Sequence, residues 1–429
     1  MKTETSEHPQ RWTQLAWLSV CNLLAMTLWF SVSAVAPALK TAWELSPLDQ
    51  AWLTISVQIG FATGALASAV WNLADRWPAP RLLAASALIG ALLSATIPLL
   101  FTNEMARTHG GFLLVLLLRG ATGAMLAGIY PVGMKLMASW FRQGRGLAIG
   151  IMVGALTVGS ALPHLIRILP LDQMAAQFLP SIGGSLPETW RLVLLTASGC
   201  SLLAAMLGFI FLRSGPWLPN AATFDWSYFV KVWQDEPLRR ANFGYLGHMF
   251  ELYAMWTWAP QLLRDAYAGA GYSLDSASLV SFATVAVGGF GCVAAGRFAD
   301  RRGRCLTTIV SLLISGTCAL AAGSLTQWPV LLTIVCLIWG VSVIADSAQF
   351  SAAVSELCDQ QYVGTALAIQ TCTGFLLTTL TIAALPVLQT WLGWPLATAI
   401  LAIGPVVGIW NMIRLRGLPQ AARLAAGKR

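Results

Sequence analysis

The sequence predicts an all-α membrane protein with twelve transmembrane helices, arranged as two six-helix bundles related by a pseudo-twofold axis. Hydrophobic residues make up 57% of the 429-residue chain and charged residues only 10%, whereas a soluble domain carries about 25% charged residues. Apolar runs of about 20 residues, long enough to cross a hydrocarbon core, recur along the whole chain. A short turn sequence at residues 73–76 returns in fuller form at residues 296–304, about half the chain later, which indicates a duplicated unit.

Six predicted spans belong to each half of the chain. In order, they lie at residues 13–38, 49–71, 82–101, 111–135, 146–168, 190–212, 241–263, 276–297, 305–324, 328–351, 362–386 and 392–413. We therefore expect an N-terminal bundle at residues 1–212, a cytoplasmic central linker at residues 213–240, and a C-terminal bundle at residues 241–429 that ends in a short cytoplasmic tail.

The positive charges predict the orientation of these spans, because Lys and Arg concentrate in the cytoplasmic loops of helical membrane proteins. With both termini in the cytoplasm, the outer loops hold only Lys40, Arg107, Arg167, Arg191 and Arg264. The formal net charge of +8 then reflects topology, and nucleic-acid binding is not expected. We expect a multi-pass protein of the plasma membrane, which in a bacterium is the inner membrane.

The repeated turn carries a family resemblance. Residues 296–304 read GRFADRRGR and resemble the G-x-L-A-D-R-x-G-R signature of the major facilitator superfamily. The first copy, NLADR at residues 72–76, keeps the core of the signature but has Trp71 and Pro78 in place of its glycines. The resemblance implies a latch that holds the cytoplasmic helix ends and acts as a gate; the alternative is a solvated turn that only sets topology. The gating residues would be Asp75, Arg76, Gly296, Asp300, Arg301, Gly303 and Arg304.

Ionisable side chains within the spans point to function, because a charge at the middle of a bilayer costs about 2.5 to 3.5 kcal/mol and persists mainly where it has a task. Three such residues are Arg119, Glu251 and Asp346. Arg119 lies in LRGATG, which resembles the arginine-containing signature of helix four in the superfamily. This resemblance implies a role in proton coupling or anion binding; the alternative is a structural arginine bonded to backbone carbonyls.

The second half supplies the predicted proton site. His248 and Glu251 are three residues apart and share one face of a helix. A carboxylate beside an imidazole in a low dielectric can exchange a proton near neutral pH. Asp346 is pseudo-equivalent in position to Arg119, and in the superfamily helices one, four, seven and ten line the central cavity. An Arg119–Asp346 ion pair that breaks when substrate or a proton arrives would form a gate. For both pairs, the alternative is a fixed structural contact.

Trp29, Trp256 and Gln349 complete the predicted substrate and coupling site. Aromatic walls with few polar groups suit a small organic or planar substrate, although aromatic residues at helical spacing also serve packing. His164 and Arg167, at the outer end of the fifth span, are candidates to meet anions, with a structural or interfacial role as the alternative.

We therefore expect a secondary active transporter, coupled to protons, that moves a small solute by alternating access of its two bundles. The solute would be an anion or a small organic molecule. The sequence contains no Walker-type phosphate loop, no metal-spaced cluster and no nucleophile with its base, so we expect neither an enzyme nor a cofactor or metal site. Its partners would be substrate, protons and the lipid bilayer, and it would act as a monomer. The alternatives are a transport-inactive membrane sensor and a passive facilitator. Spans one, five and ten also resemble, weakly, the branch of nitrate/nitrite and cyanate-type carriers.

Overall fold

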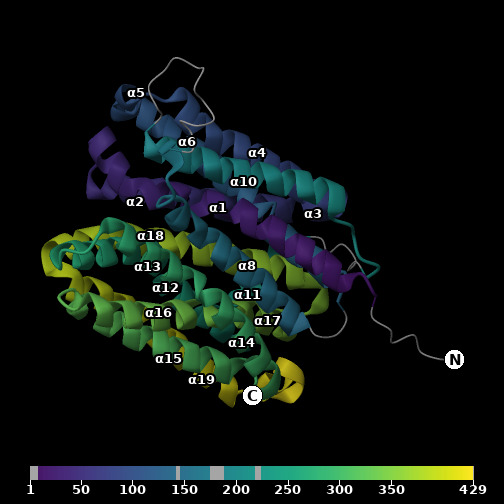
Figure 1. Ribbon diagram of the computed structural model, residues 1–429. Coiled ribbons are helices and arrows are strands. Elements are labelled where there is room, and N and C mark those ends of the chain that lie inside the picture. Colours follow the sequence, from purple (N-terminus) through teal and green to yellow (C-terminus); the bar gives the residue numbers. More distant parts are fainter. Residues whose placement is uncertain (1–7, 142–144, 174–187, 218–223, 429) are drawn as a thin grey trace.

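The computed structural model describes residues 8–141, 145–173, 188–217 and 224–428, and the regular structure of these residues is helical (Figure 1). The first group of helices, called the N-half below, comprises α1 (Arg11–Trp43), α2 (Pro47–Val70), α3 (Leu73–Arg76), α4 (Ala79–Leu100), α5 (Asn103–Arg107), α6 (His109–Ala127), α7 (Tyr130–Ala138), α8 (Arg145–Ile166) and α10 (Thr189–Phe211). The predicted all-α fold is confirmed.

The second group, called the C-half, follows in the chain and lies beside the first (Figure 1). It comprises α11 (Ser227–Gln234), α12 (Glu236–Gly269), α13 (Leu274–Ala286), α14 (Gly288–Arg302), α15 (Arg304–Ala322), η1 (Gly323–Leu325), α16 (Pro329–Ala345), α17 (Ser347–Leu357), η2 (Gln360–Tyr362), α18 (Val363–Leu401), α19 (Ile403–Gly417) and η3 (Pro419–Gly427). The predicted linker therefore contains the short helix α11, which packs on α12 and α18.

The predicted spans correspond to helices of the structure. Among the described residues, ten segments are long and apolar enough to cross a membrane. The last of these, Val363–Gly417, contains both the eleventh and the twelfth predicted span, and Gly393 with its φ of 72° interrupts the helix between them. The seventh predicted span lies in α12, a helix of 34 residues that is not among the ten. Charged residues lie near both of its ends, and His248 and Glu251 lie in its middle.

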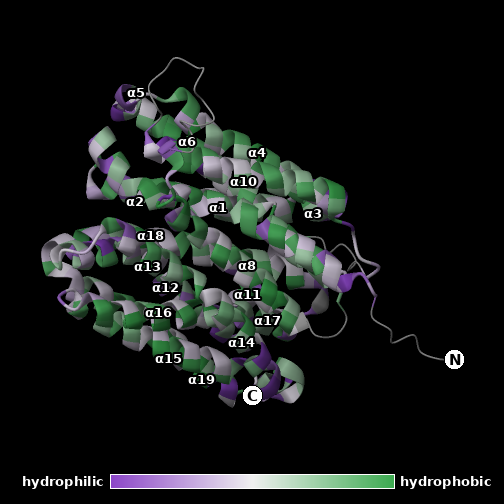
Figure 2. Ribbon diagram, in the orientation of Figure 1, coloured by the Kyte–Doolittle hydropathy of each residue, from purple (hydrophilic) through white to green (hydrophobic). Residues whose placement is uncertain are grey.

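The lateral surface of the molecule is apolar. Phe209, Phe290 and Trp391 are 70%, 78% and 79% exposed, and Figure 2 shows hydrophobic residues along the helices with hydrophilic residues gathered near their ends. Soluble monomers rarely expose apolar surface on this scale. The chain is therefore an integral, multi-pass membrane protein whose sides face lipid.

Helices approach more closely within a half than between halves. A Cβ atom added to Gly60 on α2 would overlap the backbone of α6, and one added to Gly340 on α16 would overlap the backbone of α13. Between the halves, a Cβ atom at Gly150 on α8 would lie 3.0 Å from the carbonyl oxygen of Cys292 on α14. Small residues permit such packing in membranes. Each half is thus a tightly packed unit, and the interface between the halves is looser.

The halves meet along two seams, where α8 packs on α13 and α14 and where α2 packs on α18. Helix α1 begins and η3 finishes at one end of the bundle, called the terminal end below, whereas α5 lies at the opposite end (Figure 1). The tenth span is interrupted within the C-half, because α16 ends at Ala345 and α17 begins at Ser347. Asp346 occupies this break, a position at which membrane proteins often place a functional group.

Candidate functional site

Glu251 lies inside the C-half and is bound by two donors from neighbouring helices. It is 1% exposed on α12. The hydroxyl of Ser315 on α15 donates to its Oε2 atom at 2.8 Å, and the indole nitrogen of Trp339 on α16 donates to its Oε1 atom at 2.7 Å. A carboxylate in an apolar interior needs such partners, since an unpaired buried charge is costly. Glu251 is therefore accommodated by groups that sequence reasoning did not assign to it.

His248 contacts Asp346, and not Glu251, through an ion-pair contact. The Nδ1 atom of His248 lies 2.9 Å from the Oδ1 atom of Asp346, and both side chains are 1% exposed. Asp346 Oδ2 and His248 Nε2 have no hydrogen-bond partner within the described part of the chain. The cluster of His248 and Asp346 thus joins α12 to the break between α16 and α17. Each of its two side chains has an atom that could form one more hydrogen bond. The cluster brings two ionisable side chains together in an apolar interior.

Arg119 makes the contacts that the structural alternative predicted, because it is bonded to backbone carbonyls. Its guanidinium, fully buried on α6, donates to the carbonyl oxygens of Leu28 at 3.0 Å and Trp29 at 2.7 Å, with a longer contact of 3.5 Å to Leu53. These bonds fasten α6 to α1 and α2. The expected Arg119–Asp346 ion pair is not formed in this structure, because the arginine is satisfied by backbone of its own half.

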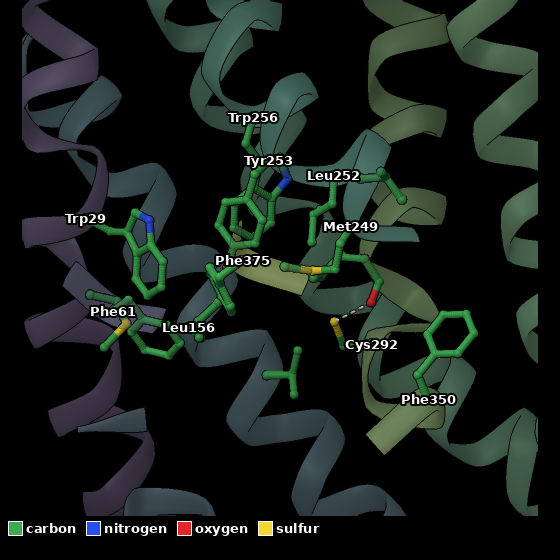
Figure 3. Close-up of a cluster of buried hydrophobic side chains, with 14 of the residues drawn as sticks. Trp29, Phe61, Leu156, Met249, Leu252, Tyr253, Trp256, Cys292, Phe350 and Phe375 are labelled. Carbon is green, nitrogen blue, oxygen red and sulfur yellow. Dashed lines mark hydrogen bonds between the residues drawn. The ribbon is translucent and has the colours of Figure 1, made fainter. Parts of the chain in front are cut away.

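An aromatic cluster fills the space between the two halves (Figure 3). Trp29 and Phe61 come from the N-half, and Tyr253, Trp256 and Phe375 come from the C-half. The ring of Phe375 lies 4.5 Å from that of Phe61 and 5.6 Å from that of Trp29, centroid to centroid. The indole nitrogens of Trp29 and Trp256 have no hydrogen-bond partner among the described residues. Both predicted tryptophans therefore lie at one aromatic interface that spans the two halves.

Two buried glutamines that sequence reasoning missed lie on the same seam. Gln58 on α2 and Gln370 on α18 are at most 1% exposed, and neither the nitrogen nor the oxygen of either amide has a partner in the described residues. Buried amides are normally hydrogen-bonded. An isolated glutamine in the middle of a long apolar run was the signal that could have revealed both.

The predicted gating residues lie at the terminal end. In the first copy, Asp75 forms an ion pair with Lys135 on α7, and Arg76 is exposed. In the second copy, the Asp300 carboxylate lies against Gly146 in the first turn of α8, across the boundary between the halves. Gly303, with a φ of 95°, makes the turn between α14 and α15.

Arg304 holds the second copy to the tenth span. Its guanidinium lies 3.0 Å from Glu356 and donates to Gln349 at 2.8 Å, while its contact with Asp300 is longer, at 3.5 Å. Gln349, predicted as a substrate or coupling residue, is thus placed with the gating residues. Arg301 is exposed, and Gly296 lies close to the backbone of Gly146 in the other half.

A recess opens at the opposite end, again between the two halves. Its lining residues are Ser33, Ala34, Ala36, Pro37, Gln50, Thr54, His164, Arg167, Thr257, Trp258, Pro260, Gln261, Arg264, Leu274, Ala277, Ser278 and Ser281. Arg119, Glu251 and Asp346 are not among them, so the predicted charged residues do not face the accessible space. The basic residues of the recess include His164 and Arg167, and Arg264 joins them although sequence reasoning treated it only as a loop charge.

Comparisons with known proteins agree with this arrangement. The family model of the Major Facilitator Superfamily matches residues 18–379. A bacterial homologue of the human lysosomal transporter Spinster, solved in an inward-facing and unoccupied conformation, has a TM-score of 0.67 and 17% identity, and the match covers 96% of this chain and 95% of that one.

Two further solved structures have the same fold. The proton:xylose symporter XylE bound to 6-bromo-6-deoxy-D-glucose matches with a TM-score of 0.67, 16% identity and coverage of 94% and 95%. The nucleoside transporter NupG matches with a TM-score of 0.66, 14% identity and coverage of 94% and 99%. No curated protein sequence matches the chain. The match of the family model over most of the chain, together with the fold, shows that this membrane protein belongs to the Major Facilitator Superfamily and that its activity is transport and not catalysis.

Proposed function

We propose that the protein is a secondary active transporter that couples the movement of a small organic solute to protons. The observation that carries this proposal is the burial of two carboxylates, Glu251 and Asp346, in a half of the molecule that shares an aromatic interface with the other half. A charge in this interior is costly unless its partners are in place. The protonation of the cluster is therefore linked to the arrangement of the helices around it.

Helix α12 connects the proton cluster with the aromatic interface. Glu251 lies on the same helix as Tyr253 and Trp256, and His248 lies one turn before Glu251. A solute that contacts Tyr253 or Trp256 therefore acts on the helix that also carries Glu251 and His248. Coupling requires that the solute and the proton favour different arrangements of the same element, and α12 is that element in this proposal.

The unpartnered polar groups of the interface supply the binding chemistry. Gln58, Gln370 and the indole nitrogens of Trp29 and Trp256 are buried without partners in the described residues. An unmade hydrogen bond of this kind costs about 1 to 3 kcal/mol. We propose that these four groups bind the solute when the interface between the halves opens.

The gating residues close the terminal end in this conformation. Gly146 in the first turn of α8 contacts the Asp300 carboxylate and the region of Gly296 on α14. A carboxylate at a helix N-terminus is favoured by the helix dipole by about 0.3 to 1 kcal/mol. We propose that the terminal end is cytoplasmic, as the distribution of Lys and Arg predicts, and that these contacts form the inner gate of a monomeric transporter, with residues 1–212 and 241–429 as its two moving bundles.

The test is transport by purified protein in proteoliposomes. Candidate solutes are first selected from a panel of carboxylates, amino acids, sugars and nucleosides by thermal stabilisation, because a ligand of the native state raises its apparent stability. Uptake of each hit is then measured with and without a proton gradient. We expect Glu251→Gln to abolish gradient-driven accumulation and to retain exchange of solute at equal concentrations, because glutamine preserves the acceptor for Trp339 and removes only the titratable group.

The matched control is Glu236→Gln, the same change in the exposed first turn of the same helix, where Glu236 pairs with Arg240. This variant should transport like the wild type. Accumulation by Glu251→Gln at the wild-type level would contradict proton coupling at this residue. Wild-type flux that ignores the proton gradient would favour the passive facilitator, and absence of flux of every panel member would favour the transport-inactive sensor.

A further inference from the structure

The recess at the opposite end has a basic lining without acidic residues. Of its lining residues, His164 and Arg167 belong to the N-half and Arg264 to the C-half, and none is Asp or Glu. His164 is 4% exposed, and Arg167 and Arg264 are half-buried. Positive groups that converge from two bundles on one small hollow oppose the packing of the bundles unless an anion lies between them.

Neither arginine has a partner that would neutralise it. Among the described residues, Arg167 and Arg264 form no ion pair or side-chain hydrogen bond, and Nη1 of Arg264 is buried without a partner. The two guanidinium groups are near enough for mutual repulsion. The segment of residues 174–187 lies outside the described residues, and its sequence contains no Asp or Glu. It therefore cannot supply a neutralising carboxylate side chain.

The acids closest to the recess are engaged or remote from its interior. The Asp265 carboxylate accepts hydrogen bonds from Gln261 at 2.6 Å and from the indole nitrogen of Trp394 at 2.9 Å. Asp275 lies exposed in the first turn of α13 and acts on Arg167 only at a distance, without an ion pair. Neither acid is among the described lining residues, so the two guanidinium groups face the recess without a carboxylate beside them.

The surroundings of the recess indicate what kind of anion it takes. Its free volume is about 40 Å³, room for a few water molecules, which suits one charged head group. Ser33 and Thr257 line the recess, and one turn or less further along the same helices lie Phe30 and Trp256. The recess therefore lies within about one helical turn of the aromatic cluster along α1 and α12.

We infer that this recess binds the carboxylate head of a small organic anion, with Arg167 and Arg264 holding it from opposite halves while its apolar body points towards the aromatic cluster. Guanidinium groups bind carboxylates through paired hydrogen bonds, and the second amide N–H of Gln50 and of Gln261 adds a neutral donor near the head group. This inference rests on the proposed function in that it names the solute class, an aromatic or similarly apolar carboxylate.

The test uses benzoate as the probe and benzamide, its neutral isostere, as the control ligand. Binding to purified full-length protein in detergent is measured by calorimetry and by thermal stabilisation at one fixed pH, with no proton gradient. We expect benzoate to bind and benzamide to bind at least about tenfold more weakly. Arg167→Gln and Arg264→Gln should each weaken benzoate binding by at least about tenfold, whereas Arg107→Gln, at an exposed arginine of the same end that pairs with Glu44, should not.

Several results would overturn the inference. They are equal binding of benzoate and benzamide, wild-type affinity in both recess variants, or binding of inorganic phosphate in place of benzoate. Each recess variant must elute as a monodisperse protein and melt within about 2 °C of the wild type; Arg167→Lys and Arg264→Lys, which keep the charge, replace any variant that does not. Because binding is measured without a proton gradient, benzoate binding that depends on both arginines can be found whether or not transport responds to protons, so the two proposals fail separately.

Discussion

The two halves of the molecule share one architecture but treat buried charge in opposite ways. In the described N-half, the charged residue buried among the helices is Arg119, and its guanidinium is bonded to backbone carbonyls of α1 and α2. In the C-half, the buried charged residues are the acids Glu251 and Asp346, which are bound by side chains from three different helices. A backbone carbonyl does not titrate and is fixed in place by its helix, whereas a carboxylate titrates and a side chain can rotate away from its partner.

This contrast suggests a division of labour after duplication. Arg119 joins α6 to its neighbours much as the glycine contacts of α2 and α6 do, so these helices of the N-half are held together as one unit. The acid cluster of the C-half depends on the position of α12 relative to the break at Asp346. We therefore expect changes in the N-half to affect stability first and changes in the C-half to affect coupling first.

The largest effect is expected from Arg119→Met, which keeps the apolar stem and removes the guanidinium. The two shorter hydrogen bonds of the charged guanidinium tie α6 to α1, and their loss should cost about 3 to 5 kcal/mol, although the carbonyls of Leu28 and Trp29 keep their hydrogen bonds within α1. Thermal unfolding of the purified variant should show a clear loss of stability, with Arg107→Met as a near-neutral control. A variant that melts like the wild type and has lost proton coupling would instead make Arg119 a functional residue.

A smaller loss of stability and a larger loss of coupling are expected from Asp346→Asn. Asparagine can still contact His248 but cannot be charged, so position 346 no longer exchanges a proton. Gradient-driven accumulation of a transported solute should fall by about tenfold or more, and its dependence on pH should flatten. The melting temperature should change by less than in Arg119→Met. A loss of stability as large as that of Arg119→Met would show that both halves use their buried charges for structure.

Much of this arrangement was predictable because membrane insertion constrains sequence strongly. The spans followed from apolar length, and the repeated turn located the pair of halves. Rare charges identified Arg119, Glu251 and Asp346 as residues of interest, since mid-bilayer charges are expensive. Helical spacing placed His248 and Glu251 on one face, but it could not say that each would find its partner on another helix.

The partners were missed for a physical reason, since they depend on how helices pack and not on their sequence periodicity. Ser315 and Trp339 are ordinary residues of apolar spans, and only the approach of α15 and α16 to α12 brings them to Glu251. The equivalent positions of Arg119 and Asp346 in the two repeats suggested that they form a pair. In the structure, each of these residues contacts groups of its own half. Arg264 gained meaning only when the structure brought it to the same recess as Arg167.

The smallest effect on stability is expected from a change at Glu188, an acid at the surface of the N-half that is not buried among the helices. Glu188, just before α10, is about half exposed, and it accepts hydrogen bonds from Asn103 and Trp190 and pairs with Arg191. Partial burial raises the pKa of Glu188, but these hydrogen bonds outweigh burial and hold its pKa below the usual value. Its stabilising contribution is thus complete above the ordinary carboxyl pKa of about 4.3 and is lost as the pH falls through the depressed pKa.

Glu188→Gln should therefore lower stability by no more than about 1 kcal/mol at neutral pH, and the difference from the wild type should vanish in acid. Melting curves of both proteins at a series of pH values measure this directly. Transport and its pH profile should be unchanged, because the acid lies outside the helices that carry the proton cluster. If the variant altered the pH profile of transport, acids of the N-half would share in coupling, and the division of labour between the halves would have to be abandoned.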